Sequence, residues 1–249
     1  MSTATTDPAA SDLLALWERA GASPAAERDD ALLRAAYGSD APMASLGGRN
    51  AALLGLRARL FGASQPLRCN CPHCRATAEF SIDCGALAQT LLPSNDVAHT
   101  HRLETGGHHI EFRLPDVFDL REASLWAEDS AAFVSTLLSR CVLLSERDDG
   151  TPCAPEDLPA SVAEALSRRM EEIEPGASVS FDLACPECGQ AWVAPMNVGD
   201  VVWSELQSRA ERLLLDVDAL ARAYGWSETE VLALNPWRRA AYLQLVGAA

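Results

Sequence analysis

Two copies of the motif Cys-Pro-x-Cys constrain the fold of this chain more than any other feature. They span residues 71–74 and 185–188, with about 110 residues between them. Each motif can present two thiolates from one tight turn, and four thiolates form the closed tetrahedral set of a structural zinc ion. The predicted ligands of one structural Zn²⁺ are Cys71, Cys74, Cys185 and Cys188. The intervening chain must then leave the site and return to it, so the site constrains the topology.

The cysteine usage as a whole indicates a reducing compartment. The chain has eight cysteines, and its first residues show neither the basic nor the apolar region of a secretory signal. In such a compartment, paired cysteines bind metal or carry out redox chemistry rather than forming structural disulfides. We therefore expect a cytoplasmic protein. Four cysteines outside the motifs are expected to be simple buried or exposed thiols: Cys69, Cys84, Cys141 and Cys153.

A redox function is the main alternative reading of the first motif. Cys-Pro-His-Cys resembles the active site of the periplasmic disulfide oxidases of the thioredoxin superfamily. That chemistry needs a helix beginning at the first cysteine, which lowers the pKa of its thiol. Residues 75–83 instead alternate between polar and apolar side chains, as a strand does. The metal interpretation is therefore favoured.

The net charge limits the possible partners. The chain carries a formal charge of −15 and all its basic residues are arginines. Residues 69–199 hold 21 acidic residues against eight arginines. Such a region repels phosphate backbones, so we expect protein partners and no nucleic acid. No apolar run approaches the ~20 residues of a membrane span, so no membrane partner is expected.

The N-terminal part of the chain is predicted to be helical. We expect a disordered tip at residues 1–10 and three short helices within residues 11–68. In the third helix, leucines recur at helical spacing. Arg49, Arg57 and Arg59 lie mostly off that face, and we expect them to form a solvated arginine face rather than an anion site.

Residues 69–199 are predicted to form a zinc-ribbon-like antiparallel β region. Residues 99–114 are typical of a hairpin turning on two glycines, with Leu103 opposite Ile110 and Arg102 opposite Glu111. A helical insertion is expected at residues 116–175. Four histidines cluster in the hairpin, and we favour polar margin residues over a second metal site: His99, His101, His108 and His109.

Residues 200–249 are predicted to be helical again. Apolar residues recur at three- and four-residue spacing up to a stop at Gly225, and residues 227–230 form a capping box. A last helix starts at residue 236, with core positions expected at Trp237, Leu243 and Val246. Together with the preceding regions, this pattern predicts an α+β fold.

Two functions from different classes fit these elements. No catalytic triad or phosphate-binding loop stands out, so we expect no enzyme. The terminal helices and the ribbon could belong to a DNA-binding transcriptional regulator. The second of those helices, however, is acidic and then apolar, whereas base recognition needs basic or amide side chains. A protein interaction module is therefore preferred.

Several stretches are similar to a known family. They comprise GRNAALLGLRARLFG at residues 48–62, both cysteine motifs, Trp203-x-Glu205-Leu206, and residues 220–243. They resemble the baseplate proteins, or baseplate hub assembly chaperones, of contractile phage tails and phage-tail-like injection systems. The resemblance implies a non-enzymatic protein that helps to assemble the baseplate, the platform joining spike, tube and sheath. Its implied partners are baseplate, spike or hub proteins.

Overall fold

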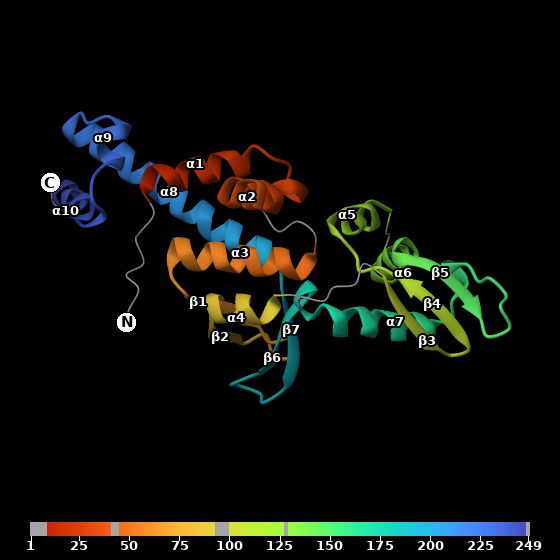
Figure 1. Cartoon of the computed structure of the whole chain (residues 1–249). Coiled ribbons are helices and arrows are strands. Elements are labelled where there is room, and N and C mark those ends of the chain that lie inside the picture. The colour runs from red at the N-terminus through yellow and green to blue at the C-terminus, as the bar shows by residue number, and fades with distance from the viewer. Residues whose placement is uncertain (1–8, 41–44, 93–99, 127–128, 248–249) are drawn as a thin grey trace. The chain divides into compact units, whose positions relative to one another are not determined.

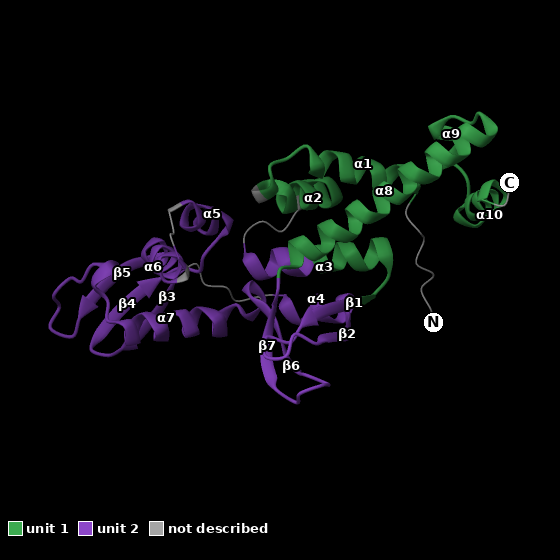
Figure 2. Ribbon diagram, turned by 180° about the vertical axis from the view of Figure 1, so that it is seen from behind, with its two compact units in different colours: residues 1–41, 53–65, 197–249 green, residues 42–52, 66–196 purple. Residues whose placement is uncertain are grey.

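The computed structural model describes residues 9–40, 45–92, 100–126 and 129–247, which form helices and small sheets (Figure 1). Most of the expected N-terminal tip and His99 lie outside these ranges. The described chain is α+β, as predicted, with two two-stranded sheets and one three-stranded sheet. It divides into two compact units (Figure 2). Unit 1 comprises residues 1–41, 53–65 and 197–249, and unit 2 comprises residues 42–52 and 66–196.

Unit 1 is helical. Its elements are α1 (Ala10–Gly21), η1 (Ala25–Glu27), α2 (Arg28–Tyr37), η2 (Gly38–Asp40), the second part of α3 (Leu46–Phe61), α8 (Val198–Tyr224), α9 (Glu228–Leu232) and α10 (Pro236–Gly247). Helix α1 packs against α2 and α8 through an apolar face. The buried residues of α8 recur at helical spacing, among them Val202, Leu206, Ala210 and Leu213.

The ends of the C-terminal helices follow the predicted caps. Helix α8 ends where Gly225 adopts a left-handed conformation with φ +69°, which glycine accepts without steric cost. Ser227 and Glu230 form the predicted capping box at the start of α9. These caps determine where α8 stops and α9 begins.

The predicted core positions of α10 are wrong. Trp237 is 86% exposed, and no residue of α10 is buried. Leu243 and Val246 are only half-buried. The helix has the amphipathic sequence of a packed element, but no other described element covers its apolar residues fully.

The predicted solvated arginine face on α3 is wrong for Arg49 and Arg57, whereas Arg59 is exposed as predicted. Arg57 is 2% exposed, and its guanidinium pairs with Glu205 of α8 at 2.9 Å. It also donates to the carbonyl oxygens of Gly62 and Ser64. Arg49 is buried as well. Burial of Arg57 is possible because a carboxylate and two carbonyls replace the lost water.

Unit 2 contains both cysteine motifs. Its strands are β1 (Ser64–Asn70, whose first two residues belong to unit 1), β2 (Thr77–Asp83), β3 (His101–Thr105), β4 (His108–Phe112), β5 (Val142–Arg147), β6 (Val179–Ala184) and β7 (Ala191–Met196). Its helices are α4 (Cys84–Leu91), α5 (Val117–Trp126), α6 (Ser130–Cys141), η3 (Pro155–Asp157), α7 (Ala160–Ile173) and η4 (Pro175–Ala177), with the first residues of α3. Strand β1 thus begins within the segment expected to be helical.

The predicted hairpin register is confirmed. Leu103 lies opposite Ile110, and Arg102 lies opposite Glu111. The insertion expected to be helical at residues 116–175 contains α5, α6 and α7, but β5 interrupts it and pairs with β4 as a third strand, which the prediction missed. The sheet packs with α6 and α7 around a buried cluster: Ile110, Phe112, Leu138, Cys141, Val162, Leu166 and Met170.

Candidate metal centre

The two cysteine motifs form equivalent turns between antiparallel strands. In the first turn, Cys71 N–H donates to Ala76 O and Arg75 N–H donates to Cys71 O, each at 2.9 Å. In the second, Cys185 N–H donates to Gln190 O and Gly189 N–H donates to Cys185 O, also at 2.9 Å. The same backbone bonds therefore close both turns. Each turn holds its two thiols on the same side.

The two turns bring the four sulfur atoms together. All four Sγ atoms lie within 4.8 Å of one another. Across the turns, Cys71 Sγ lies 3.8 Å from Cys188 Sγ, and Cys74 Sγ lies 3.5 Å from Cys185 Sγ. A tetrahedral ion with ~2.3 Å metal–sulfur bonds has sulfur–sulfur edges of ~3.8 Å. A disulfide needs ~2.05 Å, so the sulfur spacing fits a shared metal ion rather than a bond.

Burial differs between the members of each pair. Cys71 and Cys185, the first cysteine of each motif, are 1% and 3% exposed, whereas Cys74 and Cys188 are exposed. The rings of Phe80 on β2 and Phe181 on β6 meet edge to face at 5.3 Å. This contact joins the two hairpins next to the site.

The thiols of Cys74 and Cys185 differ in pKa. The backbone N–H groups of Cys188 and Glu187 lower the pKa of Cys185 to about 7, although burial opposes them. The backbone N–H of Ala76 lowers the pKa of Cys74, but the neighbouring thiols and burial outweigh it and raise that pKa to about 12. The side chain of Cys185 thus opposes ionisation of Cys74 and Cys188. A bound cation offsets this repulsion between thiolates, because its positive charge stabilises all four of them.

The donor set determines what the centre can do. Four thiolates suit a soft or borderline ion such as zinc, and they leave no open position for water or substrate. The residues present therefore fit a closed structural site. They do not supply the geometry of a catalytic metal.

The other predicted thiols and histidines lie apart from this centre. Cys84, Cys141 and Cys153 are buried and Cys69 is half-buried, and none of them belongs to the four-sulfur group. The His101 ring lies 5.5 Å from that of Phe112, and His108 Nδ1 contacts Gly106 O. His109 lies between the carboxylates of Glu104 and Asp148. These histidines thus have packing and hydrogen-bonding partners in the hairpin.

A buried ionic cluster near the start of α5 was missed by the sequence reasoning. Asp119 is 1% exposed and accepts two hydrogen bonds from Arg113 and one from Arg140. Burial raises the pKa of Asp119, but the bonds from Arg113, Asp116 N–H and Arg140 prevail and lower it to about 2. Asp119 N–H in turn donates to the Asp116 carboxylate. Arg113 lies six residues before Asp119 and Arg140 lies 21 residues after it, so no single short motif contains the cluster.

The fold and the site define an α+β protein whose two antiparallel cysteine hairpins meet at a four-thiol centre. The chain belongs to the family described as T4 bacteriophage base plate protein, which matches residues 32–202. That range includes both cysteine motifs and the stretch at residues 48–62. The similar residues at 220–243 lie beyond it.

No curated protein and no solved structure gives a significant match to the chain. None of the described helices is both long enough and apolar enough to cross a membrane.

Proposed function

We propose that this protein is a non-enzymatic component or assembly chaperone of the baseplate of a contractile, phage-tail-like particle. The family match over residues 32–202 carries the proposal. We propose further that it works in the cytoplasm by contacts with baseplate, spike or hub proteins. The formal charge of −15 supports protein partners over nucleic acid. The acidic first turn of α9 gives no support to a DNA-reading helix.

The four cysteines are proposed to hold one structural Zn²⁺, with Cys71, Cys74, Cys185 and Cys188 as its ligands. The sulfur spacing and the all-thiolate donor set support zinc over a hard ion such as Mg²⁺. The ion is proposed to contribute to folding, since binding to a site that is absent from the unfolded chain stabilises the folded one.

Deletion of the gene in its host tests the assembly function. We expect no complete particles, with sheath and tube proteins left unassembled, and restoration when the gene is supplied in trans. Mass spectrometry of particles from the complemented strain then separates the two forms of the proposal. A component is present in purified particles, and an assembly chaperone is present only in the lysate. Normal particle yield after deletion contradicts both.

A further inference from the structure

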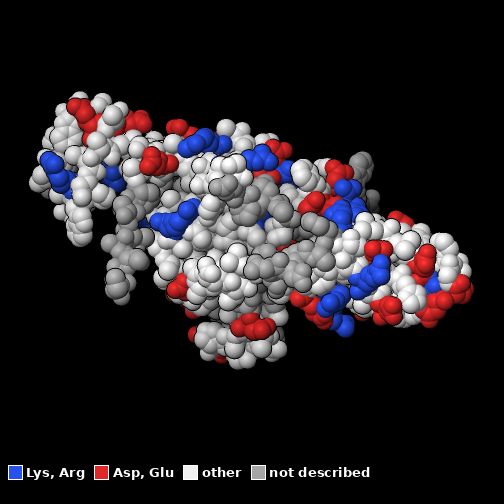
Figure 3. Space-filling view, viewed as in Figure 1, with Lys and Arg blue, Asp and Glu red and all other residues white. Residues whose placement is uncertain are grey.

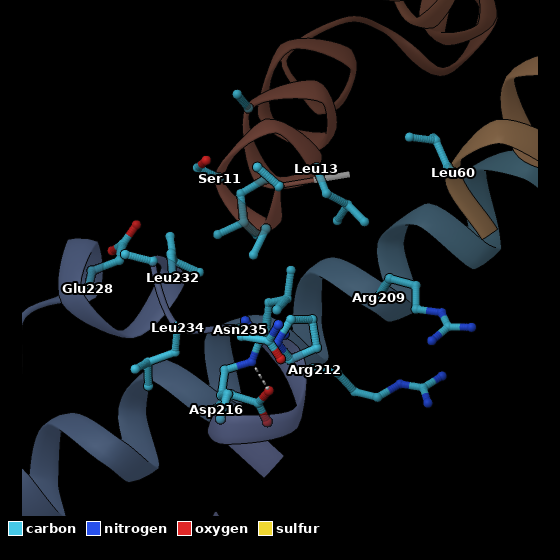
Figure 4. Close-up of a pocket in the computed structure, with 18 of the residues that line it drawn as sticks. Ser11, Leu13, Leu60, Arg209, Arg212, Asp216, Glu228, Leu232, Leu234 and Asn235 are labelled. Atoms are coloured by element: carbon cyan, nitrogen blue, oxygen red, sulfur yellow. Dashed lines mark ion pairs between the residues drawn. The ribbon is translucent and has the colours of Figure 1, made fainter. Parts of the chain in front are cut away.

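Unit 1 contains an open groove that is separate from the cysteine centre (Figure 4). It is bounded by the start of α1, the end of α3, the middle of α8, and α9 with the start of α10. Its volume is about 1250 Å³. Pockets for small molecules measure ~300–1000 Å³. The size and openness of the groove therefore favour a segment of polypeptide over a small ligand.

The groove offers apolar side chains from several helices. Leu13 comes from α1, Leu60 from α3, and Leu232 and Leu234 from α9 and the residues after it (Figure 4). Leu60, Leu232 and Leu234 are only partly buried within the described chain. A partner that covers them gains the free energy of removing their apolar surface from water.

One wall of the groove is basic, although the chain as a whole is acidic. Arg59, Arg209 and Arg212 line it, and all three are exposed. In Figure 4 the side chains of Arg209 and Arg212 extend from α8 toward the same side. Over the visible face of the chain, acidic side chains are widespread and basic ones form small groups (Figure 3). The groove is therefore a site where negative charge is attracted.

These guanidinium groups are weakly engaged. Arg212 donates its Nε to Ser208 O, and within the described chain its guanidinium contacts no carboxylate. Arg209 lies 3.9 Å from Glu205, the limit of an ion pair. Arg59 lies over the ring of Tyr37 at 4.6 Å.

Three acidic residues line the groove, and within the described chain none of them forms an ion pair with an arginine of this wall: Glu18, Asp216 and Glu228. Asp216 is neutralised by Arg239 at 3.2 Å. Glu228 lies on α9, away from the two arginines of α8 (Figure 4). Donors for partner carboxylates therefore remain available on the α8 wall.

We propose that this groove binds an acidic segment of another protein of the particle. Apolar side chains of that segment pack against the leucines, and its carboxylates pair with Arg59, Arg209 and Arg212. That the partner belongs to the particle rests on the proposed function. A second copy of this chain is disfavoured as the occupant, since each copy carries a formal charge of −15 and two copies repel.

Fluorescence polarisation with synthetic peptides tests the groove directly. The probe is a labelled short peptide with leucine and glutamate at helical spacing, and its counterpart carries lysine in place of glutamate. We expect the glutamate peptide to bind, more weakly at higher salt, and the lysine peptide not to bind. The double substitution Arg209→Glu/Arg212→Glu should weaken binding by about tenfold or more, because it replaces two attractions with repulsions.

Arg222→Glu is the matched control. It makes the same substitution at one position of the same helix, and this exposed position is paired with Asp218 outside the groove. It should leave peptide binding unchanged. Equal binding of both peptides, or equal loss in both variants, overturns the proposal. So does dimerisation in sedimentation velocity that the double substitution abolishes without any peptide binding, since the groove then serves self-association.

Complementation of the deletion strain separates this proposal from the assembly function. If the wild-type gene and Arg222→Glu restore particles but Arg209→Glu/Arg212→Glu does not, the result supports the groove proposal and the assembly function together. If the double variant restores particles fully, the groove proposal fails and the assembly function stands. If deletion itself leaves particle yield unchanged, the assembly function fails, and peptide binding still decides whether the groove takes acidic segments.

Discussion

At the residue scale, the two cysteine turns differ at the position after the second cysteine. Arg75 occupies it in the first turn with φ +63°, and Gly189 occupies it in the second with φ +72°. Arg75 is the one non-glycine residue with positive φ in the described part of the chain. A side chain in this region is disfavoured by roughly 1–2 kcal/mol. The conformation of the first cysteine turn thus requires local strain at Arg75.

Arg75→Gly should stabilise unit 2 by about 1 kcal/mol, because glycine adopts the positive φ without a steric penalty. Gly189→Ala is the counterpart in the second turn and should destabilise unit 2 by a similar amount. Urea unfolding of the metal-loaded protein measures both changes. A destabilised Arg75→Gly would show that the arginine side chain has a stabilising role.

Cys185→Ser should abolish stoichiometric zinc binding, because a hydroxyl replaces one of four thiolates and the site loses its closed set. Cys69→Ser is the control, since Cys69 lies on β1 outside the four-sulfur group. Inductively coupled plasma mass spectrometry of protein dialysed against a weak chelator measures the ratio of zinc to protein. We expect one zinc per chain in wild type and Cys69→Ser and almost none in Cys185→Ser. Full retention by Cys185→Ser contradicts the assigned ligand set.

At the scale of elements, an ionic cluster joins α5 to α6 and to the segment after β4. Asp119 at the start of α5 binds Arg113 after β4 and Arg140 at the end of α6. Removing one charge from such a buried ionic cluster leaves the opposite charges without a counter-ion. The carboxylate of Asp119 therefore adds to the packing that holds α5 against α6.

Asp119→Asn should lower the free energy of unfolding by roughly 2–4 kcal/mol, because two guanidiniums lose their anion. It should also alter the dependence on pH. The pKa of Asp119 is 3.8 in the unfolded chain and about 2 in the folded chain. Between these two pH values the unfolded chain therefore binds more protons than the folded one. The carboxylate's contribution, on the order of 2 kcal/mol, is thus complete above pH 4 and lost as pH falls from 4 toward 2.

Denaturant titrations of metal-free wild type and metal-free Asp119→Asn between pH 2.5 and pH 6 measure this difference, because acid protonates the thiolates and would release a bound ion from both proteins. The gap between the two proteins should narrow as the pH falls. Asp157→Asn is a control, since Asp157 is exposed on η3 and its carboxylate pairs with no arginine within the described chain. A constant gap across this range would show that Asp119 does not carry the pH dependence.

Elements were predictable from sequence where their partners are near in the chain. The hairpin register followed from alternation around Gly106 and Gly107, and the capping box from residues 227–230. Strand β5 was missed because its apolar run directly continues that of α6. Its strand character comes from pairing with β4, which is about 30 residues earlier. Local periodicity carries no information about such pairing.

At the scale of the whole molecule, the chain is organised as two units with different sources of stability. Unit 1 consists of helices packed through apolar faces. Unit 2 contains all four cysteines of the metal centre and its hairpins are short. Two-stranded sheets are marginal on their own, so we expect unit 2 to depend more on the proposed metal ion.

Removal of metal with a zinc chelator should therefore loosen unit 2 selectively. Hydrogen–deuterium exchange is expected to show lost amide protection in β1, β2, β6 and β7, with α1, α2 and α8 still protected. Adding zinc back should restore the protection. Equal loss in both units, or unchanged protection throughout, would contradict a structural role confined to unit 2.

The sequence by itself determined the metal-centre candidates, the α+β class, the hairpin register and the helix caps. These depend on residue type and short spacing, which are local properties. Only the tertiary structure decided that Arg57 is buried against Glu205, which lies 148 residues away, and that Trp237 is exposed. Burial depends on which distant surface covers a side chain. Amphipathic periodicity shows that a helix has an apolar face, but not whether another element covers it.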